Sequence, residues 1–432
     1  MSYLYLMLSL TAFVTLLPCA LYLINRIRDP FHPLMFVGAL ACMMSVYGVV
    51  TGAHRVDSVI THEAINVFLL VTMLSVLGFY AGWGLHWRAT RVQEIQVAMP
   101  MVEYEPSKLL LWAVIFDLLG VGAHFYTRHE YTVTGYVRDF NALWISSAIL
   151  SIQILLMSPR HRVGACLTLA VALLPPLDRF FDYGQRGDTF RLAIIILPVF
   201  LYKKFRPSRA YFIPAVMFFA LILGTLERTR GMTEAGMAAN RVDAIFKMLP
   251  TVLQDQKEGT FRTDESWLFG TGMIQTVREE QSYEYGGWIR NIGVRFLPKE
   301  LFDKDQYYTS WSITQYTIHT EENMIFPIPY GSAPTGFAHV FVQFSWAAPL
   351  FWMLLGYAAR RCYIRALLTD DIRYHAYLVG YFIIGLYLIS QDLYAATMNG
   401  IYFLPCLMIA YKASRHPEAS LELQPAGALP LT

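Results

Sequence analysis

Apolar residues occur along this chain in long blocks separated by polar connections, rather than in short alternating runs. A helix that crosses a bilayer needs about 20 consecutive and mostly apolar residues. About eleven blocks approach this length, and they cover residues 3–25, 31–51, 64–86, 109–127, 141–157, 163–181, 188–203, 210–226, 335–359, 375–392 and 397–413. The pattern predicts an all-α polytopic membrane protein with about 11 (10–12) transmembrane helices.

The composition supports this interpretation. Apolar residues make up 55% of the 432 residues and charged residues only 15%, whereas about 25% of a soluble domain is charged. All five cysteines fall in or beside the apolar blocks and form no CxxC pair, so neither a disulfide framework nor a metal site is expected. The first block lacks a basic leader and a small-residue cleavage site, which favours a retained helix over a signal peptide.

Basic residues in the short connections predict the orientation, because cytoplasmic loops of membrane proteins are enriched in Lys and Arg. When the connections are numbered alternately, one set holds 17 basic residues and the other holds six. The first set is therefore expected to be cytoplasmic, which puts the N-terminus outside and the C-terminus inside. The net charge of +2 indicates no nucleic-acid partner, since these basic residues define topology.

One long hydrophilic segment interrupts the apolar pattern. The predicted organisation is eight helices over residues 1–225, a large periplasmic loop or lid over 226–333, three helices over 334–413 and a cytoplasmic tail over 414–432. The lid contains tryptophans and tyrosines, which disordered segments usually lack. We expect one helix over residues 231–256, a break at Gly270–Gly272, and a second helix over residues 273–285.

A first group of charged residues lies between Asp178 and Arg191, at the outer end of the sixth and seventh blocks. Charges at a membrane boundary are costly unless they are paired or hydrated. Arg186 and Arg191 are candidate pyrophosphate ligands, since a guanidinium can donate two parallel hydrogen bonds. Gly187 would let a helix N-terminus add backbone donors. The alternative is that Asp and Arg pair with each other and tie two helices together.

A second basic group fills the hydrophilic segment and mixes cations with apolar residues. Such a loop can lie at the headgroup level and contact a lipid phosphate, and the alternative is ordinary solvated charge. Its candidate substrate-binding residues are Arg228, Arg230, Arg290, Arg295, Lys299 and Lys304. Asp303-Lys304-Asp305 matches a short metal-binding pattern, but no nucleotide-binding domain surrounds it, so we expect no metal and no cofactor.

A reaction in which a hydroxyl attacks an activated centre needs a carboxylate or imidazole that takes the hydroxyl proton. The candidate bases are His339, Glu322, His319 and Glu280. Asp117 lies near the middle of the fourth block, seven residues before His124, so it is expected to be paired or functional.

The layout resembles the bacterial oligosaccharide repeat-unit polymerases, the Wzy-type O-antigen and exopolysaccharide polymerases. Both have many helices and one large external segment late in the chain. Gln185-Arg186-Gly187 looks like the family's Ser-Arg-Gly element, and Arg295-Phe-Leu-Pro298-Lys299 with Lys304 is similar to its Ile-Pro-Arg and Lys-Pro stretch. Residues 336–346 look like the family's Gly-…-Glu-…-Asn-Phe-Gly element, with His339 in place of Glu.

The resemblance implies a metal-independent glycosyltransferase in the bacterial inner membrane. It would polymerise undecaprenyl-pyrophosphate-linked repeat units on the periplasmic face, with a lipid-linked donor, a lipid-linked acceptor and a chain-length regulator as partners. Three alternatives stay open: an O-antigen ligase, a lipid-linked oligosaccharide flippase or polysaccharide transporter, and a membrane-bound acyltransferase. A transporter would show internal repeats, and the sequence shows none.

Overall fold

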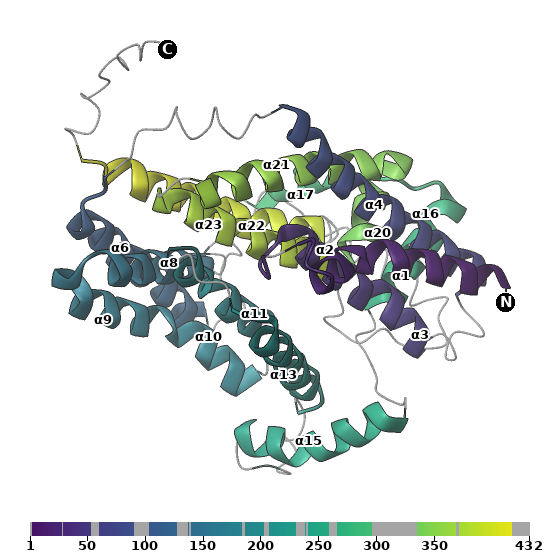
Figure 1. Ribbon diagram of the computed structural model, residues 1–432, viewed down its shortest axis with the longest axis horizontal. Coiled ribbons are helices and arrows are strands. Elements are labelled where there is room, and N and C mark those ends of the chain that lie inside the picture. The colour runs from purple at the N-terminus through teal and green to yellow at the C-terminus, as the bar shows by residue number, and fades with distance from the viewer. Residues whose placement is uncertain are drawn as a thin grey trace.

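The computed structural model describes residues 2–27, 29–52, 60–89, 103–127, 137, 140–183, 186–202, 207–229, 238, 241–258, 266–295, 335–368 and 371–416. These residues form helices and their connections, without a strand (Figure 1). In chain order the α-helices are α1 Ser2–Leu23, α2 Pro33–Ala41, α3 Gly48–Gly52, α4 His62–Ala89, α6 Pro106–Thr127, α8 Leu143–Met157, α9 Arg162–Ala172, α10 Leu174–Asp178, α11 Arg186–Ile195, α12 Leu197–Tyr202, α13 Arg209–Arg228, α15 Arg241–Glu258, α16 Ser266–Glu280, α17 Gly287–Arg295, α20 Gly336–Phe344, α21 Ala348–Leu368, α22 Ile372–Ser390 and α23 Leu393–Ala413.

Nine helical spans in the described part of the chain are long and apolar enough to cross a membrane. They coincide with nine of the predicted blocks and make this a multi-pass membrane protein. The spans are Tyr3–Leu23, Pro33–Thr51, His62–Leu85, Pro106–Thr127, Phe140–Met157, Pro159–Phe181, Gly336–Leu367, Ile372–Ser390 and Leu393–Ala413. The seventh predicted block corresponds to the shorter apolar helix Phe190–Phe200 and the eighth to α13, so the total of about eleven stays a prediction.

Glycines bring the helices α4 and α21 into close contact. A Cβ atom at Gly82 would collide with the backbone oxygen of Met353, and one at Gly356 would collide with that of Phe79. In a bilayer, the hydrophobic effect does not drive helices together. Small residues promote association there because they let the two backbones approach and pack closely. The helices α4 and α21 consequently pack closely against each other (Figure 1).

The helices α22 and α23 form an antiparallel hairpin, in which α22 is the more buried helix. The helix α8 packs against this hairpin on one side and against α6 and α9 on the other. Nearly all of α8 is buried, including its three serines and Gln153. Ser146 donates to the Phe403 carbonyl at 3.3 Å, and Gln153 donates to the Ile372 carbonyl at 2.8 Å. These polar contacts link segments that are more than 200 residues apart in the sequence.

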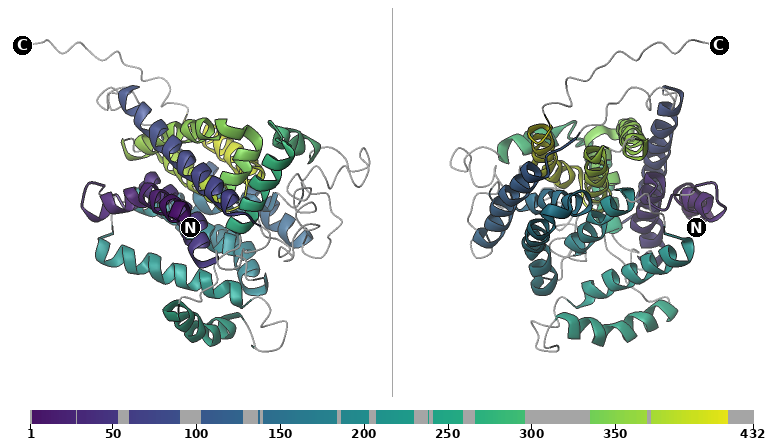
Figure 2. Two further views of the ribbon diagram at one scale, coloured as in Figure 1. Left: turned by 90° about the vertical axis from the view of Figure 1, so that its right-hand side faces the viewer. Right: turned by 60° about the vertical axis from the view of Figure 1, so that its left-hand side comes forward.

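The hydrophilic segment contributes two kinds of helix. The helix α15 lies apart from the bundle, beside α13, and is the lowest helix in the views of Figures 1 and 2. In contrast, α16 packs against α4 and α20, and most of it is buried.

The predicted chain break at Gly270–Gly272 is wrong, because α16 runs through both glycines. Gly270 instead permits close packing: a Cβ there would lie 3.1 Å from Ala338 Cβ and 3.2 Å from Thr335 Oγ1. A glycine in a helix costs about 1 kcal/mol relative to alanine, and the contact between α16 and α20 offsets it. The second helix also begins earlier and ends earlier than predicted, at Ser266 and Glu280.

Candidate functional site

Two of the predicted site residues, Arg191 and His339, contact the α22–α23 hairpin near its turn. Asp392 caps α23, since its side chain accepts a hydrogen bond of 2.6 Å from the Ala395 backbone N–H. Burial raises the pKa of Asp392 to about 6. The helices α11, α17 and α20 each contact α22 or α23 near this turn. We call the side chains of Arg191, His339, Tyr387, Asp392 and Asn399 the turn cluster.

The His339 side chain fixes the start of α23. It lies in the first turn of α20, whose N-cap Thr335 accepts from the Ala338 N–H. Gly336 lets α20 approach α22 closely, because a Cβ there would collide with the Leu388 carbonyl oxygen. His339 Nδ1 accepts a hydrogen bond of 3.0 Å from the Leu393 N–H, and the side chain is only 1% exposed.

Arg191 on α11 is the buried cation of the turn cluster. Its Nη2 donates to Asn399 Oδ1 at 3.2 Å, and its guanidinium lies 4.3 Å from the centre of the Tyr387 ring. Asn399 is in turn fixed by a 2.7 Å hydrogen bond from its amide to the Ala395 carbonyl. The side chain of Arg191 is 7% exposed. Arg191 is thus held inside the bundle by an amide and an aromatic ring.

Arg186 opens α11, as predicted, although its side chain lies outside the described residues. The next residue, Gly187, is close to the turn cluster: a Cβ there would lie 3.4 Å from Tyr387 Oη. The first turn of α11 therefore lies beside the ring on which Arg191 stacks. The free backbone N–H groups of such a turn carry partial positive charge.

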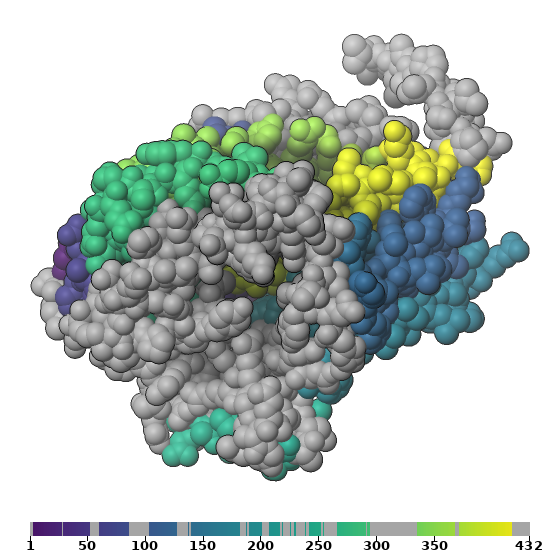
Figure 3. All heavy atoms as spheres, turned by 180° about the vertical axis from the view of Figure 1, so that it is seen from behind, coloured from purple at the N-terminus to yellow at the C-terminus, as the bar shows by residue number. Residues whose placement is uncertain are grey.

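The helix α17 brings part of the second basic group to the same hairpin. Ile292 packs against a small apolar cluster formed by Ala142 with Met398 and Tyr402 of α23. Arg290, two residues earlier, is exposed. Seen from behind, α16 and α17 (green) and α23 (yellow) occupy one face of the molecule (Figure 3).

The remaining predicted residues are distributed as follows. Glu280 is exposed at the end of α16, where it accepts from Ser282 Oγ at 3.5 Å. Arg228 and Arg295 end α13 and α17, and nothing further is described of their side chains. Arg230, Lys299, Lys304, His319 and Glu322 lie outside the described residues.

The first charged group divides into two parts. Asp178 lies 2.8 Å from His124 Nε2 and joins α10 to α6. Arg179 donates at 3.0 Å to the side-chain oxygen of Asn141, in the amide orientation that satisfies both groups. Both contacts join separate segments, as the alternative expected of this group, but their described partners are His124 and Asn141 and not an Asp–Arg pair. Arg191 belongs to the turn cluster. Asp117 faces Ser147, and its Oδ1 is buried without a hydrogen-bond partner in the described part of the chain.

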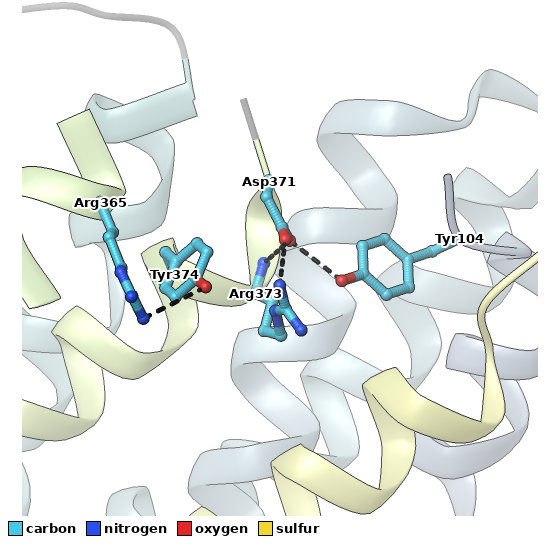
Figure 4. Close-up of polar contacts among 5 residues, drawn as sticks. All are labelled: Tyr104, Arg365, Asp371, Arg373 and Tyr374. Carbon is cyan, nitrogen blue, oxygen red and sulfur yellow. Dashed lines mark hydrogen bonds and ion pairs between the residues drawn. The ribbon is translucent and has the colours of Figure 1, made fainter. Parts of the chain in front are cut away.

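A second polar cluster lies at the other end of α22 (Figure 4). Asp371 pairs with Arg373 at 2.7 Å and accepts from Tyr104 Oη at 3.0 Å. Burial, reinforced by Asp371, raises the pKa of Tyr104. Arg365 donates to Tyr374 Oη at 3.5 Å. We call these five residues the closed cluster, because its central charges neutralise each other.

Sequence reasoning missed three members of the turn cluster. Asp392 carried a signal, since it is an isolated acid between two apolar blocks. Tyr387 and Asn399 carried none, because tyrosine and asparagine are common in apolar helices of bundles. No group of three His, Cys, Asp or Glu side chains that could hold a metal occurs among the described residues. Comparisons with family models, with curated proteins and with solved structures find no match to the chain.

Proposed function

We propose that this membrane protein polymerises glycan repeat units carried on undecaprenyl pyrophosphate, on the periplasmic face of the inner membrane. The observation that carries the proposal is Arg191. A buried guanidinium is expensive, and its contacts with Asn399 and Tyr387 hold it at a fixed position beside the first turn of α11. A guanidinium held in this way can donate charge-assisted hydrogen bonds to a ligand that carries negative charge.

A pyrophosphate leaving group would bring that charge. As the bond between the sugar and the pyrophosphate breaks, negative charge grows on the leaving oxygen, and fixed donors lower the energy of that state. Arg191 and the first turn of α11 supply a cation and backbone N–H groups beside Tyr387. Arg290 on α17 supplies a further cation near the same hairpin. The donor is already activated, so no nucleotide or metal is required.

The test is to delete the gene and to separate the surface polysaccharide by size. Loss of long chains, with single repeat units still attached to the surface lipid, supports a polymerase. Accumulation of a long polymer that remains on its lipid carrier indicates a ligase instead. Polysaccharide with a normal length distribution overturns the proposal. Purified protein in vesicles with lipid-linked repeat units should then make polymer without added metal.

The predicted orientation has its own test, because the proposed site must face the periplasm. Tyr285, between α16 and α17, is 72% exposed. In a variant whose native cysteines are replaced, Tyr285→Cys should react with an impermeant thiol reagent that has access to the periplasm alone. Reaction only after the inner membrane is opened would show that this connection faces the cytoplasm. The proposed site would then lie on the opposite side of the membrane from its substrate.

A further inference from the structure

A chain of three side chains connects the α16–α17 connection to the α22–α23 turn. Gln343 on α20 donates through Nε2 to Glu284 Oε2, and its Oε1 accepts from the Trp288 N–H at 3.3 Å. The same Nε2 lies 3.3 Å from His339 Nε2, and His339 Nδ1 accepts from Leu393. Glu284 is half-buried, whereas Gln343 and His339 are fully buried. Glu284 is therefore the outermost member of the chain.

Strained backbone surrounds these side chains. Gln281 and Tyr285 have φ angles of 53° and 41°, and Ser345, at the end of α20, has 51°. Positive φ in such residues is unfavourable and persists where the surrounding structure enforces it. The Glu284 N–H also donates to the Val342 carbonyl at 3.1 Å. The strained connection thus fixes Glu284 against α20.

At one point along these three side chains, two hydrogen-bond donors face each other. His339 Nδ1 accepts from Leu393, so in the neutral ring the proton is on Nε2. That N–H points toward Gln343 Nε2, which is also a donor. With Glu284 ionised, the chain therefore contains one donor facing another donor at 3.3 Å.

A proton on Glu284 would relieve that mismatch. A protonated carboxyl can donate, so the Gln343 amide could turn and accept through Oε1 from both Glu284 and His339. The cost is the hydrogen bond from the Trp288 N–H, which lies at the N-terminus of α17. The orientation of the Gln343 amide is thus coupled to the proton on Glu284, as suits a carboxylate that accepts and releases a proton.

His339 is less suited to this task, although its position in the sequence suggested it. Its ring is 1% exposed, and both nitrogens lie within 3.3 Å of a neighbouring nitrogen. An incoming hydroxyl would have to displace Leu393 or Gln343 to reach it. Glu284 is only half-buried and lies in the α16–α17 connection, outside α23.

We propose that Glu284 is the general base of this site, with Gln343 and His339 as positioning residues. The inference rests on the proposed glycan transfer. In that step Glu284 takes the proton of the acceptor hydroxyl, and the hydroxyl oxygen forms the new bond to the anomeric carbon. The bond from that carbon to the pyrophosphate oxygen breaks, and its electron pair leaves on the pyrophosphate. The Glu284 proton is later lost to water.

The experiment compares purified variants in vesicles that contain lipid-linked repeat units. Glu284→Gln keeps the side-chain shape and should lower kcat by about 10²- to 10⁴-fold, the usual contribution of a general base, with KM nearly unchanged. Glu284→Asp keeps the carboxylate and should retain more activity. Asp243→Asn, in the exposed pair with Lys247 on α15, is the control and should leave kcat unchanged. Thermal unfolding of each variant verifies that it is folded.

A second measurement detects the missing carboxylate directly. Added formate should restore part of the rate of Glu284→Ala, because a small carboxylate can occupy the vacated space, and it should not accelerate Asp243→Ala. Folded Glu284→Gln with a normal kcat, or a Glu284→Ala rate that formate leaves unchanged, overturns the assignment of the base. Polymer made by the wild-type protein in the same assay still supports the proposed function. If the wild-type protein makes no polymer, both proposals are overturned.

Discussion

An arginine lies at each end of α22, and its surroundings differ between the two ends. At Asp371 the charges neutralise each other: Arg373 pairs with the carboxylate at 2.7 Å, and Tyr104 donates to the same group (Figure 4). At the other end Arg191 lies on an aromatic ring and donates to an amide. The two ends are about 28 Å apart along the helix, at 1.5 Å per residue over its 19 residues. That span is close to the thickness of a bilayer core, about 30 Å.

This difference indicates that the closed cluster anchors α22, whereas the turn cluster is suited to binding a ligand. An ion pair that is neutral overall has little attraction left for a third charge, so the closed cluster fixes α22 to the connections around it. Arg191 is held by an amide and an aromatic ring, an arrangement that leaves a guanidinium able to donate to an anionic ligand. The turn cluster is therefore the end at which changes of charge should affect chemistry, and the closed cluster is the end at which they should affect stability.

The largest effect is expected for Arg191→Lys. A lysine keeps the charge but cannot make two parallel hydrogen bonds or stack on Tyr387 in the same way. Losing a charge-assisted contact made mainly in the transition state should cost about 2–4 kcal/mol, which is about 30- to 1000-fold in the polymerisation rate. The measurement is the rate for purified protein in vesicles.

Arg209 provides a matched control for that substitution. It also stacks on a tyrosine, with its guanidinium 4.8 Å from the Tyr22 ring, and it also donates to an asparagine, Asn25. It begins α13, away from the turn cluster. Arg209→Lys should leave the rate nearly unchanged. Equal losses in both variants would show that Arg191 contributes packing rather than binding.

The next effect concerns pH and Asp392. Burial raises its folded-state pKa from 3.8 to about 6, so the folded protein binds more protons than the unfolded chain between these values. Stability should therefore rise on acidification from pH 7 toward pH 4, by up to about 3 kcal/mol. Asp392→Asn keeps a capping side chain and should remove this part of the pH dependence. Thermal unfolding at several pH values measures both, and an unaltered pH dependence in the variant would exclude Asp392 as the titrating group.

A smaller effect is expected at the closed cluster. Asp371→Asn removes the charge that balances Arg373 but keeps a cap for α22. It should destabilise the fold by about 1–3 kcal/mol, less than a fully buried pair, because Arg373 is partly exposed. The rate per folded molecule should stay normal. Loss of rate without loss of stability would contradict the division between the two ends.

The smallest effect is expected for Arg290→Ala. This exposed arginine can approach the headgroup of a bound lipid from α17, where solvent weakens its attraction. We expect roughly a tenfold lower rate, or about 1.4 kcal/mol, mostly through KM. Lys412→Ala, in the last turn of α23, is the control at the other end of the helix and should behave as wild type. A wild-type rate in Arg290→Ala would show that Arg290 is an ordinary surface charge and does not bind the substrate.

Much of the fold could be predicted from the sequence because the bilayer imposes it. Nine apolar blocks appear as helical spans, since hydrocarbon requires every backbone group to be hydrogen-bonded within its own helix. The error at Gly270 has the same origin: glycine breaks helices in water, but within a bundle it lets α16 approach α20. Which effect dominates depends on a neighbour about 70 residues away in the chain.

For the site, the sequence by itself identified Arg191 and His339, because charged or polar groups near an apolar helix end are costly and so have a reason to be there. Their partners were decided by tertiary structure alone. Arg191 meets Tyr387 and Asn399 across about 200 residues, and His339 meets Leu393 across 54. The local pattern determines which segments enter the membrane, because burial from water depends on composition. Only packing determines which side chains share a hydrogen bond, because that depends on distances of about 3 Å between separate helices.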